Sequence, residues 1–324
     1  MNILLTSVGR RGYLVRYFKD ALGSGGRVWG ADNSRYAPGF GYCDHRVIIP
    51  DITHSDYMPN LLELCRVNHI DIVIPLIDPE LCVLSDYKEE FDRLGILLLL
   101  SPQATIQTTA DKYHTWQFAR RHGIGVPQTF IALDETLARL DAGTLRWPLM
   151  VKPRRGSASM NLAYCDDRVQ LEGAFSACPE PMIQEVVKGP EYGYDLFGDL
   201  DCRPVSVFCK RKLAMRAGET DKAVSTNNPG LIAFGAMLLE QFNLIGPADV
   251  DVVVDKDGPK LLEINPRFGG GYPCAHLGGA AFPQKVLALR RGEVLAPDIG
   301  ACPEGVCMLK QDEIIQPDWD GLKG

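Results

Sequence analysis

The strongest constraint on the fold is the alternation of short apolar runs with amphipathic segments over residues 1 to about 105. The runs NILLT at 2–6, IDIVIPL at 70–76 and ILLLL at 96–100 are each long enough for one strand, and segments such as YLVRYFKDAL at 13–22 lie between such runs. A repeated strand–helix–strand pattern predicts a parallel sheet with helices on both faces, because parallel neighbours need a crossover connection. We therefore expect an α/β domain over residues 1–108.

Two acidic residues follow the apolar run at 70–76. Asp78 and Glu80 stand where ligands bind in parallel-sheet folds, beyond the carboxyl end of a strand, so both are candidate substrate residues. The same residues could instead cap the helix that follows, with Pro79 in its first turn. The turn SVGRRG at 7–12 lacks the GxGxxG pattern and gives little support to a dinucleotide site.

Charge and composition limit the partners. The formal net charge is −7 and basic runs are absent, which argues against a nucleic-acid partner. No stretch of 18 apolar residues occurs, so we expect no membrane segment and a soluble, cytoplasmic protein. The ten cysteines are scattered without a CxxC pair, which favours reduced thiols that serve mainly as packing groups.

A basic loop interrupts two apolar runs in WPLMVKPRRGSASMNLAYC at 147–165. The loop offers backbone N–H groups, hydroxyls and two arginines to an anion, and Lys152 on the preceding strand adds a point charge. This chemistry suits a triphosphate, although a polar hairpin turn with solvated arginines is an alternative. The common phosphate-loop motif GxxxxGK[ST] is absent.

The segment PMIQEVVKGPEYGYDLFGD at 181–199 predicts a strand, a short linker and a second strand. Such a linker can expose backbone groups to a purine ring, and Glu191 then stands where a ribose could be held. Glu185 and Glu191 could equally be solvated charges on an edge strand.

A carboxylate pair is predicted on a hairpin near the C-terminal end. The runs DVDVVVD at 249–255 and PKLLEIN at 259–265 flank an Asp-Gly turn, and pairing outward from it brings Asp251 opposite Glu263 or within one residue of it. Facing carboxylates are unfavourable unless a cation lies between them, and Asn265 adds a third oxygen ligand, so the set suits magnesium. Two strand-end carboxylates pointing to water are the alternative.

The combination of motifs resembles a known family. LLEINPR, the VKP strand with its RRGSAS loop, the DK that opens the helix in ADKYHTW, and the QEVVKGPEY linker stand in the order and approximate spacing of ATP-grasp enzymes. The branch is similar to one half of the carbamoyl-phosphate synthase large subunit and to the pyrrolysine-pathway ligase. The resemblance implies a Rossmann-like pre-ATP-grasp domain at 1–108 and an ATP-grasp region at 109–324, with a small nucleotide lobe at about 124–187 and a metal- and substrate-binding remainder.

The resemblance also implies roles for individual residues. The implied nucleotide-binding residues are Lys112, Lys152, Gly156, Ser157, Ser159, Glu185, Val187 and Glu191. The implied metal ligands are Asp251, Glu263 and Asn265, and Arg267 lies beside the γ-phosphate and the phosphorylated intermediate. Asn265, Arg267 and Lys210 are thus the candidate catalytic residues. Backbone groups of Gly269 and Gly270 are expected near the acyl group, and Lys210, Arg216 and Lys222 are candidates for holding an anionic substrate, although some of these cations must be solvated.

The function that the resemblance implies is ATP-dependent ligation of a carboxylate to an amine through an acyl phosphate, with ADP and phosphate as products. ATP and Mg²⁺ or Mn²⁺ are the expected cofactors, and a small carboxylate and an amine are the expected partners. A carbamoyl-phosphate-synthase-like enzyme that releases its phosphorylated product is an alternative, and a nucleotide-binding module without catalysis is another. The sequence leaves the oligomeric state open, a homodimer included.

Overall fold

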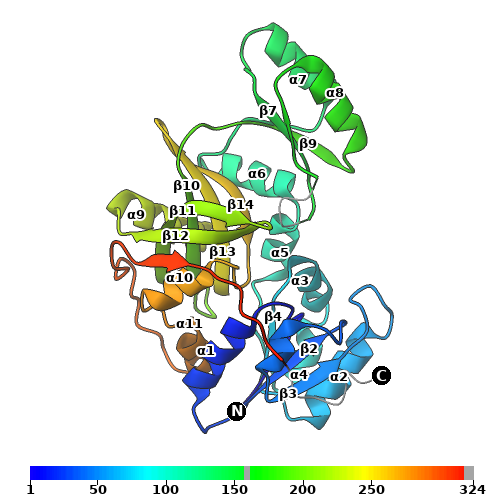
Figure 1. The fold of residues 1–324 in the computed structure, drawn as a ribbon, viewed down its shortest axis with the longest axis vertical. Coiled ribbons are helices and arrows are strands. Elements are labelled where there is room, and N and C mark those ends of the chain that lie inside the picture. Colours follow the sequence, from blue (N-terminus) through cyan, green and yellow to red (C-terminus); the bar gives the residue numbers. More distant parts are fainter. Residues whose placement is uncertain (157–160, 317–324) are drawn as a thin grey trace.

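The N-terminal region forms a parallel five-stranded sheet, which we call sheet A (Figure 1). The computed structural model describes residues 1–156 and 161–316. In sheet order β3-β2-β1-β4-β5, the strands are β3 (His45–Ile48), β2 (Arg27–Asp32), β1 (Asn2–Thr6), β4 (Ile72–Pro75) and β5 (Leu97–Leu98). All four strand pairings are parallel, which confirms the predicted α/β class.

Helices cover both faces of sheet A because its central strand is apolar on both sides. Ile3 and Leu5 of β1 pack into a cluster with helix α1, whereas Leu4 packs into the opposite cluster with α2, α3 and α4. The helical elements of this region are α1 (Gly12–Leu22), η1 (Pro38–Gly41), α2 (Tyr57–Val67), α3 (Asp78–Ser85), α4 (Lys88–Arg93), α5 (Gln103–Thr109) and α6 (Lys112–Arg121). Gly123, with φ of +70°, follows α6, and this left-handed conformation ends the helix.

A small antiparallel sheet, sheet B, stands apart at the top of the molecule with two helices (Figure 1). In sheet order β6-β9-β7-β8, its strands are β6 (Thr129–Phe130), β9 (Pro181–Glu185), β7 (Leu149–Pro153) and β8 (Ala163–Cys165). Its helices are α7 (Leu133–Asp141) and α8 (Arg168–Ala177), and they share one apolar cluster with the sheet. The runs on either side of the basic loop, β7 and β8, therefore pair antiparallel as a hairpin.

The largest sheet, sheet C, is antiparallel and has six strands in the order β14-β13-β10-β11-β12-β15. The strands are β10 (Glu191–Gly198), β11 (Pro204–Arg216), β12 (Glu219–Thr226), β13 (Gly246–Asp255), β14 (Gly258–Asn265) and β15 (Cys307–Leu309). The helices are α9 (Pro229–Gln241), α10 (Tyr272–Leu277) and α11 (Phe282–Arg290). Alternate residues such as Val250 and Val252 pack toward α9, so the residues between them face the opposite side, where the polar site lies.

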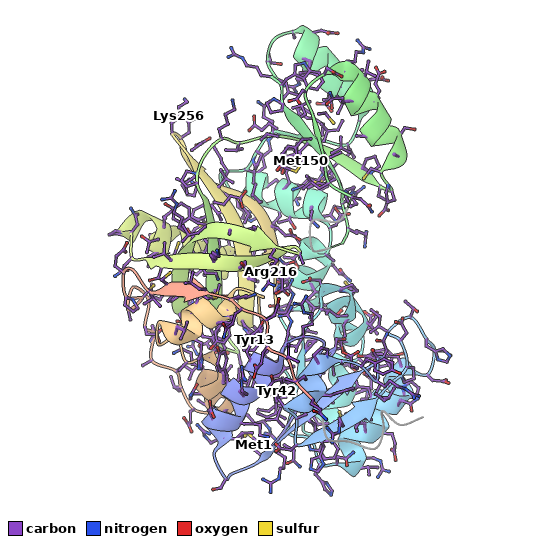
Figure 2. The ribbon with its side chains drawn as sticks, viewed as in Figure 1. Met1, Tyr13, Tyr42, Met150, Arg216 and Lys256 are labelled. Atoms are coloured by element: carbon purple, nitrogen blue, oxygen red, sulfur yellow. The ribbon has the colours of Figure 1, made fainter. Side chains whose placement is uncertain are left out.

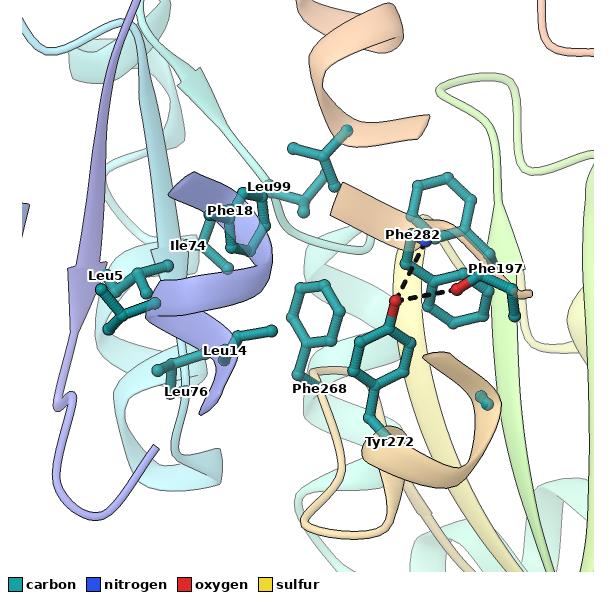
Figure 3. Packing of buried hydrophobic residues seen from close by; sticks show 14 of the residues in the cluster. Leu5, Leu14, Phe18, Ile74, Leu76, Leu99, Phe197, Phe268, Tyr272 and Phe282 are labelled. Atoms are coloured by element: carbon teal, nitrogen blue, oxygen red, sulfur yellow. Dashed lines mark hydrogen bonds between the residues drawn. The ribbon is translucent and has the colours of Figure 1, made fainter. Parts of the chain in front are cut away.

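One apolar cluster joins sheet A to the segment that follows β14 (Figure 3). Phe18 of α1 meets Phe268 edge to face, with ring centroids 5.9 Å apart, and Phe268 packs against Tyr272 at 5.0 Å. The Tyr272 hydroxyl donates to the Ala280 carbonyl at 2.9 Å and accepts from the Phe282 N–H at 3.0 Å. This packing fixes the chain on the C-terminal side of Arg267 against the first domain.

All ten cysteines are free thiols. Within residues 1–156 and 161–316, none of the helices combines the length and apolar character needed to cross a bilayer.

Candidate active site

The hairpin of β13 and β14 brings the predicted oxygen ligands together. Asp251 pairs with Glu263 and Asp249 pairs with Asn265 across the two strands, which confirms the register predicted from the Asp-Gly turn. The register shifts between Asp251 and Val252, so one bulge lies beside the carboxylate pair. Lys256 marks the far tip of this hairpin, away from the site (Figure 2).

Each of the two facing carboxylates has a lysine counter-ion. Lys212 Nζ of β11 lies 2.5 Å from Asp251 Oδ1, and Lys112 Nζ, at the first residue of α6, lies 3.2 Å from Glu263 Oε1. Lys112 also donates to the Gly156 carbonyl in the basic loop. Burial raises the pKa of Glu263, and the ammonium of Lys112 opposes this shift.

The predicted donor set fits a divalent ion whose coordination shell is completed by atoms of a bound ligand. Two carboxylates and the Asn265 amide supply only oxygens, which a hard cation such as Mg²⁺ prefers. Among the described residues, no group of three or more His, Cys, Asp or Glu side chains is arranged to hold a metal by itself. The set therefore suits a Mg²⁺ ion whose remaining positions are filled by phosphate oxygens and water rather than by a closed protein cage.

Sheet B contributes the second predicted phosphate lysine. Lys152 of β7 donates to the side-chain oxygen of Gln184 on β9 at 2.9 Å, and Gln184 in turn donates to the Thr129 hydroxyl at 2.9 Å. Burial lowers the pKa of Lys152 to about 8, although the carboxylate of Glu263 across the cleft acts in the opposite direction. A buried ammonium held by a neutral amide would gain a counter-charge from a phosphate.

An arginine of the basic loop has a structural partner within the protein. Arg154 binds Asp111, the N-cap residue of α6, with Nη2 2.6 Å from Oδ2, so this arginine ties the loop to the helix. The loop residue Gly156 adopts φ of +109°, a conformation that L side chains rarely adopt. The predicted phosphate contacts Ser157 and Ser159 lie outside the described residues.

The predicted purine and ribose residues follow β9. Glu185 ends this strand, and its carboxylate accepts from the Gln128 backbone N–H at 2.9 Å. Val187 lies in the linker between β9 and β10, and Glu191 begins β10. Glu191 is exposed and lies on the same face of sheet C as Gly193, the residue that pairs with Asp251. The linker therefore connects the lobe that carries Lys152 to the strand beside the predicted metal ligands, which we call the metal set (Asp251, Glu263 and Asn265).

Arg267 is held between the two domains. Its Nη2 donates to Asp78 Oδ2 at 2.8 Å and its Nη1 lies 3.5 Å from Asp249 Oδ2. Burial alone would lower the pKa of Arg267, but the carboxylates of Asp78 and Asp249 raise it overall. The Arg267 Nε makes no hydrogen bond within the described residues, which leaves one buried donor for a ligand.

Asp78 and Glu80, the two acidic residues after β4, lie in different environments. Asp78 begins α3 and holds Arg267, and neither Asp78 nor Glu80 caps the helix with its side chain. Glu80 is fully buried in the first domain, where its carboxylate accepts from Tyr57 and Ser7, and burial raises its pKa. The structure therefore does not bring Glu80 to the cleft around Arg267.

The side chain of Lys210 lies against Gly271, the last of the three glycines at 269–271, and does not reach solvent. It is fully buried and donates to Asp195. Burial raises the pKa of Asp195 to about 6, and the same burial would lower the pKa of Lys210, but Asp195 and Asp249 raise it overall. We infer a supporting role for this pair in the floor of the site.

The glycines after Arg267 permit a close approach of backbone to charged side chains. A Cβ on Gly269 would come within 2.4 Å of the Asp249 carboxylate, and a Cβ on Gly270 would come within 2.6 Å of the Glu219 carboxylate. Only glycine fits such contacts without displacement of the neighbouring acids.

Two predicted substrate cations lie elsewhere. Lys222 is exposed and adjacent to Ala223, which pairs with Lys212, so alternation along β12 puts Lys222 on the opposite face of sheet C. Arg216, labelled in Figure 2, is exposed at the end of β11. It forms ion pairs with Asp221 and Asp312. The structure brings neither cation to the metal set.

Sequence reasoning missed Lys212, Asp249 and Arg11. Lys212 stands two residues after Lys210, so the period-2 pattern of a strand could have placed both on one face. Asp249 stands two residues before Asp251 by the same rule. Arg11 had no comparable signal, because it comes from the loop after β1 and reaches the Phe268 carbonyl, at 2.6 Å, only through the packing of the two domains.

Comparisons with known families give the class of protein. The model of the ATP-grasp domain matches residues 109–271, and the model of the PylC-like N-terminal domain matches residues 3–99. The chain therefore belongs to the ATP-grasp family.

Relatives in sequence are distant. Uncharacterised proteins of Sinorhizobium fredii and Methanocaldococcus jannaschii are each 25% identical, over 51% and 52% of this chain, and the alignments span only 38% and 43% of those proteins. The phosphoribosylamine–glycine ligase of Phenylobacterium zucineum is 25% identical over 94% of this chain and 74% of its own length.

Solved structures share the fold at low identity. Biotin carboxylase from Campylobacter jejuni, in a complex with beta-gamma-ATP, superposes with a TM-score of 0.75 at 14% identity, over 94% of this chain and 73% of that one. The biotin carboxylase domain of Hydrogenobacter thermophilus 2-oxoglutarate carboxylase, in complex with MgADP, ADP and bicarbonate, has a TM-score of 0.71 at 14% identity, with coverages of 93% and 72%. L-amino acid ligase from Bacillus licheniformis has a TM-score of 0.67 at 20% identity, with coverages of 91% and 75%.

Proposed function

We propose that this chain is an ATP-dependent carboxylate–amine ligase that works through an acyl phosphate. The observation that carries the proposal is the convergence of two carboxylates and two cations on one cleft: Asp251, Glu263, Lys112 and Arg267. Lys152 of the small lobe lies close enough to Glu263 for this carboxylate to raise the pKa of the lysine. Ligases among the relatives and structural neighbours support the same class of reaction.

The proposed reaction has two steps. A carboxylate oxygen of the acid attacks the γ-phosphorus of ATP, and the bond from that phosphorus to the β–γ bridging oxygen breaks, which gives an acyl phosphate and ADP. The amine nitrogen then attacks the acyl carbon, the carbon–oxygen bond to phosphate breaks, and the nitrogen loses a proton. Neither step needs a covalent nucleophile from the protein.

The side chains bind and orient the reacting groups. Lys112 and Lys152 would hold the phosphates from opposite sides of the cleft, and Arg267, kept in place by Asp78 and Asp249, would face the phosphorylated carboxylate. A divalent cation on Asp251, Glu263 and Asn265 would neutralise phosphate charge. Closure of the small lobe over sheet C would exclude water that otherwise hydrolyses an acyl phosphate.

Hydroxylamine trapping tests the proposal. The protein is incubated with ATP, Mg²⁺, hydroxylamine and a panel of amino acids, hydroxy acids and sugar acids, and hydroxamate and ADP are measured. We expect one acid to yield a hydroxamate with ADP as coproduct, and mass spectrometry of reactions with candidate amines then identifies the ligated product.

Other outcomes separate the competing functions. ADP release with bicarbonate alone would indicate a carbamoyl-phosphate-synthase-like reaction. No ADP release with any acid would indicate a nucleotide-binding module, and AMP with pyrophosphate would indicate an adenylate mechanism instead of an acyl phosphate.

A further inference from the structure

The two proposed metal carboxylates are each neutralised by a lysine from a different element. Lys112 of α6 holds Glu263 and Lys212 of β11 holds Asp251, and the two lysine side chains are only 12% and 6% exposed. Lys112 also reaches the basic loop, at the Gly156 carbonyl, so it lies on the nucleotide side of the carboxylate pair. The resemblance to ATP-grasp enzymes implies no nucleotide-binding role for Lys212.

Lys212 opens into a small cavity between the two domains. The cavity is about 110 Å³ and its charged lining residues are Arg11, Lys212, Glu219, Asp249, Asp251 and Arg267. A cavity of this size, well below the ~300 Å³ of a typical drug-sized ligand pocket, accepts a small polar group.

The charges of this cavity are balanced only while Asp251 is available to Lys212. Asp249 is engaged by Arg267, and Glu219 lies 3.1 Å from Lys310. Asp251 is the only ion-pair partner of Lys212 among the described residues.

Arg11 adds a second cation, which shares the carboxylate of Glu219 with Lys310: the charges of both cations lower the pKa of Glu219. The Arg11 Nη1 donates to the Phe268 carbonyl at 2.6 Å, and Arg11 makes no ion pair with the described carboxylates. With Lys212 released, the cavity would therefore hold one cation without an ion-pair partner, Lys212, beside Arg11, which has only a shared carboxylate.

We propose that Lys212 and Arg11 form the binding site for the carboxylate that is activated, and that Lys212 becomes available to it only when Asp251 turns to a metal ion. The inference rests on the proposed function. A buried ammonium that loses its counter-ion strongly favours a new anion, so the exchange would draw a carboxylate to the side of the metal set opposite the nucleotide. Lys112 would undergo the same exchange at Glu263 and turn to a phosphate.

If Asp251 leaves Lys212 when it binds a metal ion, then Lys212 competes with the metal for Asp251. This competition can be measured without a substrate. In Lys212→Met, Asp251 has lost its competing cation, so Mn²⁺ in the presence of ADP should bind more tightly by roughly threefold or more, the size of a modest ion pair. Isothermal titration calorimetry measures this. Arg211→Met is the matched control, because Arg211 is the neighbouring residue, exposed and on the other face of the strand. Unchanged or weaker metal binding by Lys212→Met would overturn the exchange.

Acetate probes the carboxylate site directly. Melting temperature is compared in sodium acetate and in sodium chloride of equal ionic strength, with ADP and either Mn²⁺ or EDTA. For the unsubstituted chain we expect acetate to raise the melting temperature with Mn²⁺ and not with EDTA. Lys212→Met should lose this response, Lys212→Arg should retain it, and Asp251→Asn should show it without metal. An acetate response that survives in Lys212→Met would exclude Lys212 as the receptor.

An acid found in the hydroxylamine screen allows the role of Lys212 to be tested separately from the proposed ligase function. For an acid found there, Lys212→Met should raise the KM of the acid by about tenfold or more, the expected loss of a charge-assisted hydrogen bond, and leave the KM of ATP within about twofold. An unchanged KM for the acid overturns the role of Lys212 and leaves the ligase intact. A screen that finds no acid overturns the ligase, whereas the acetate and Mn²⁺ measurements still decide whether the site exists.

Discussion

The two sheets that border the cleft carry their cations differently. On sheet B, the ammonium of Lys152 is hydrogen-bonded to the neutral amide of Gln184, and burial lowers its pKa to about 8. On sheet C, Lys212 is matched by Asp251 and lies within ion-pair distance of it. Among the described residues, the cation of the small lobe therefore has no ion-pair partner, whereas Lys212 on the large sheet is paired.

The difference indicates how the two sides would respond to Mg-nucleotide. A desolvated cation without a counter-ion gains directly from a phosphate, whereas a paired cation must first lose its carboxylate. Substitutions on sheet B should thus change nucleotide affinity, and substitutions of the sheet C carboxylates should mainly change turnover.

The largest effect is expected on sheet C. Glu263→Gln keeps the size of the side chain and removes the charge that faces Asp251, so ATP consumption should fall by roughly 10²–10³-fold or more, with little change in melting temperature. ADP release in a coupled assay measures turnover, and circular dichroism monitors the fold. Glu240→Gln, on the exposed end of α9, is the control. Near-normal turnover of Glu263→Gln would remove this carboxylate from the metal set.

On sheet B, Lys152→Ala should weaken ADP binding by roughly tenfold or more, because a charge-assisted contact contributes about 1.5–3 kcal/mol. Calorimetric titration with ADP gives the affinity. Arg168→Ala removes a surface charge of the same lobe, where Arg168 pairs with Glu172, and should have no effect. Equal affinities of Lys152→Ala and the unsubstituted chain would place the nucleotide elsewhere.

The low pKa of Lys152 predicts a pH dependence of binding. The free protein loses this proton as pH rises through about 8, whereas a bound phosphate favours the charged form. ADP affinity without metal should therefore fall as the pH rises above about 8, by up to about tenfold per pH unit. Lys152→Arg stays charged and should abolish the slope. A slope that persists in Lys152→Arg would assign it to another group.

The smallest effect is expected on the outer face of sheet C. Lys222→Ala removes an exposed cation, so turnover should change by less than about twofold and the free energy of unfolding by less than about 0.5 kcal/mol. The same assay and a urea titration measure both quantities. A large loss of turnover would mean that Lys222 reaches the cleft in the working enzyme.

Local sequence signals predicted the hairpin well. An Asp-Gly turn between two alternating runs sets the register, and Asp251 does pair with Glu263. The cations of β11 and β12 were harder to place, because the ladder between these strands shifts register at Lys212, Ala214 and Met215. Irregular pairing of this kind leaves no simple mark in the sequence, so the outward position of Lys222 could not be read from the pattern alone.

The sequence by itself determined the parallel first domain, the strand that carries each proposed oxygen ligand and the membership of a family, because these follow from periodicity, turn residues and ordered motifs. Tertiary structure alone decided which charge neutralises which. Lys112 reaches Glu263, and Arg267 reaches Asp78 across 189 residues of chain. Coulomb interactions depend on distance and burial in the folded molecule, and those quantities exist only after the sheets and domains have packed.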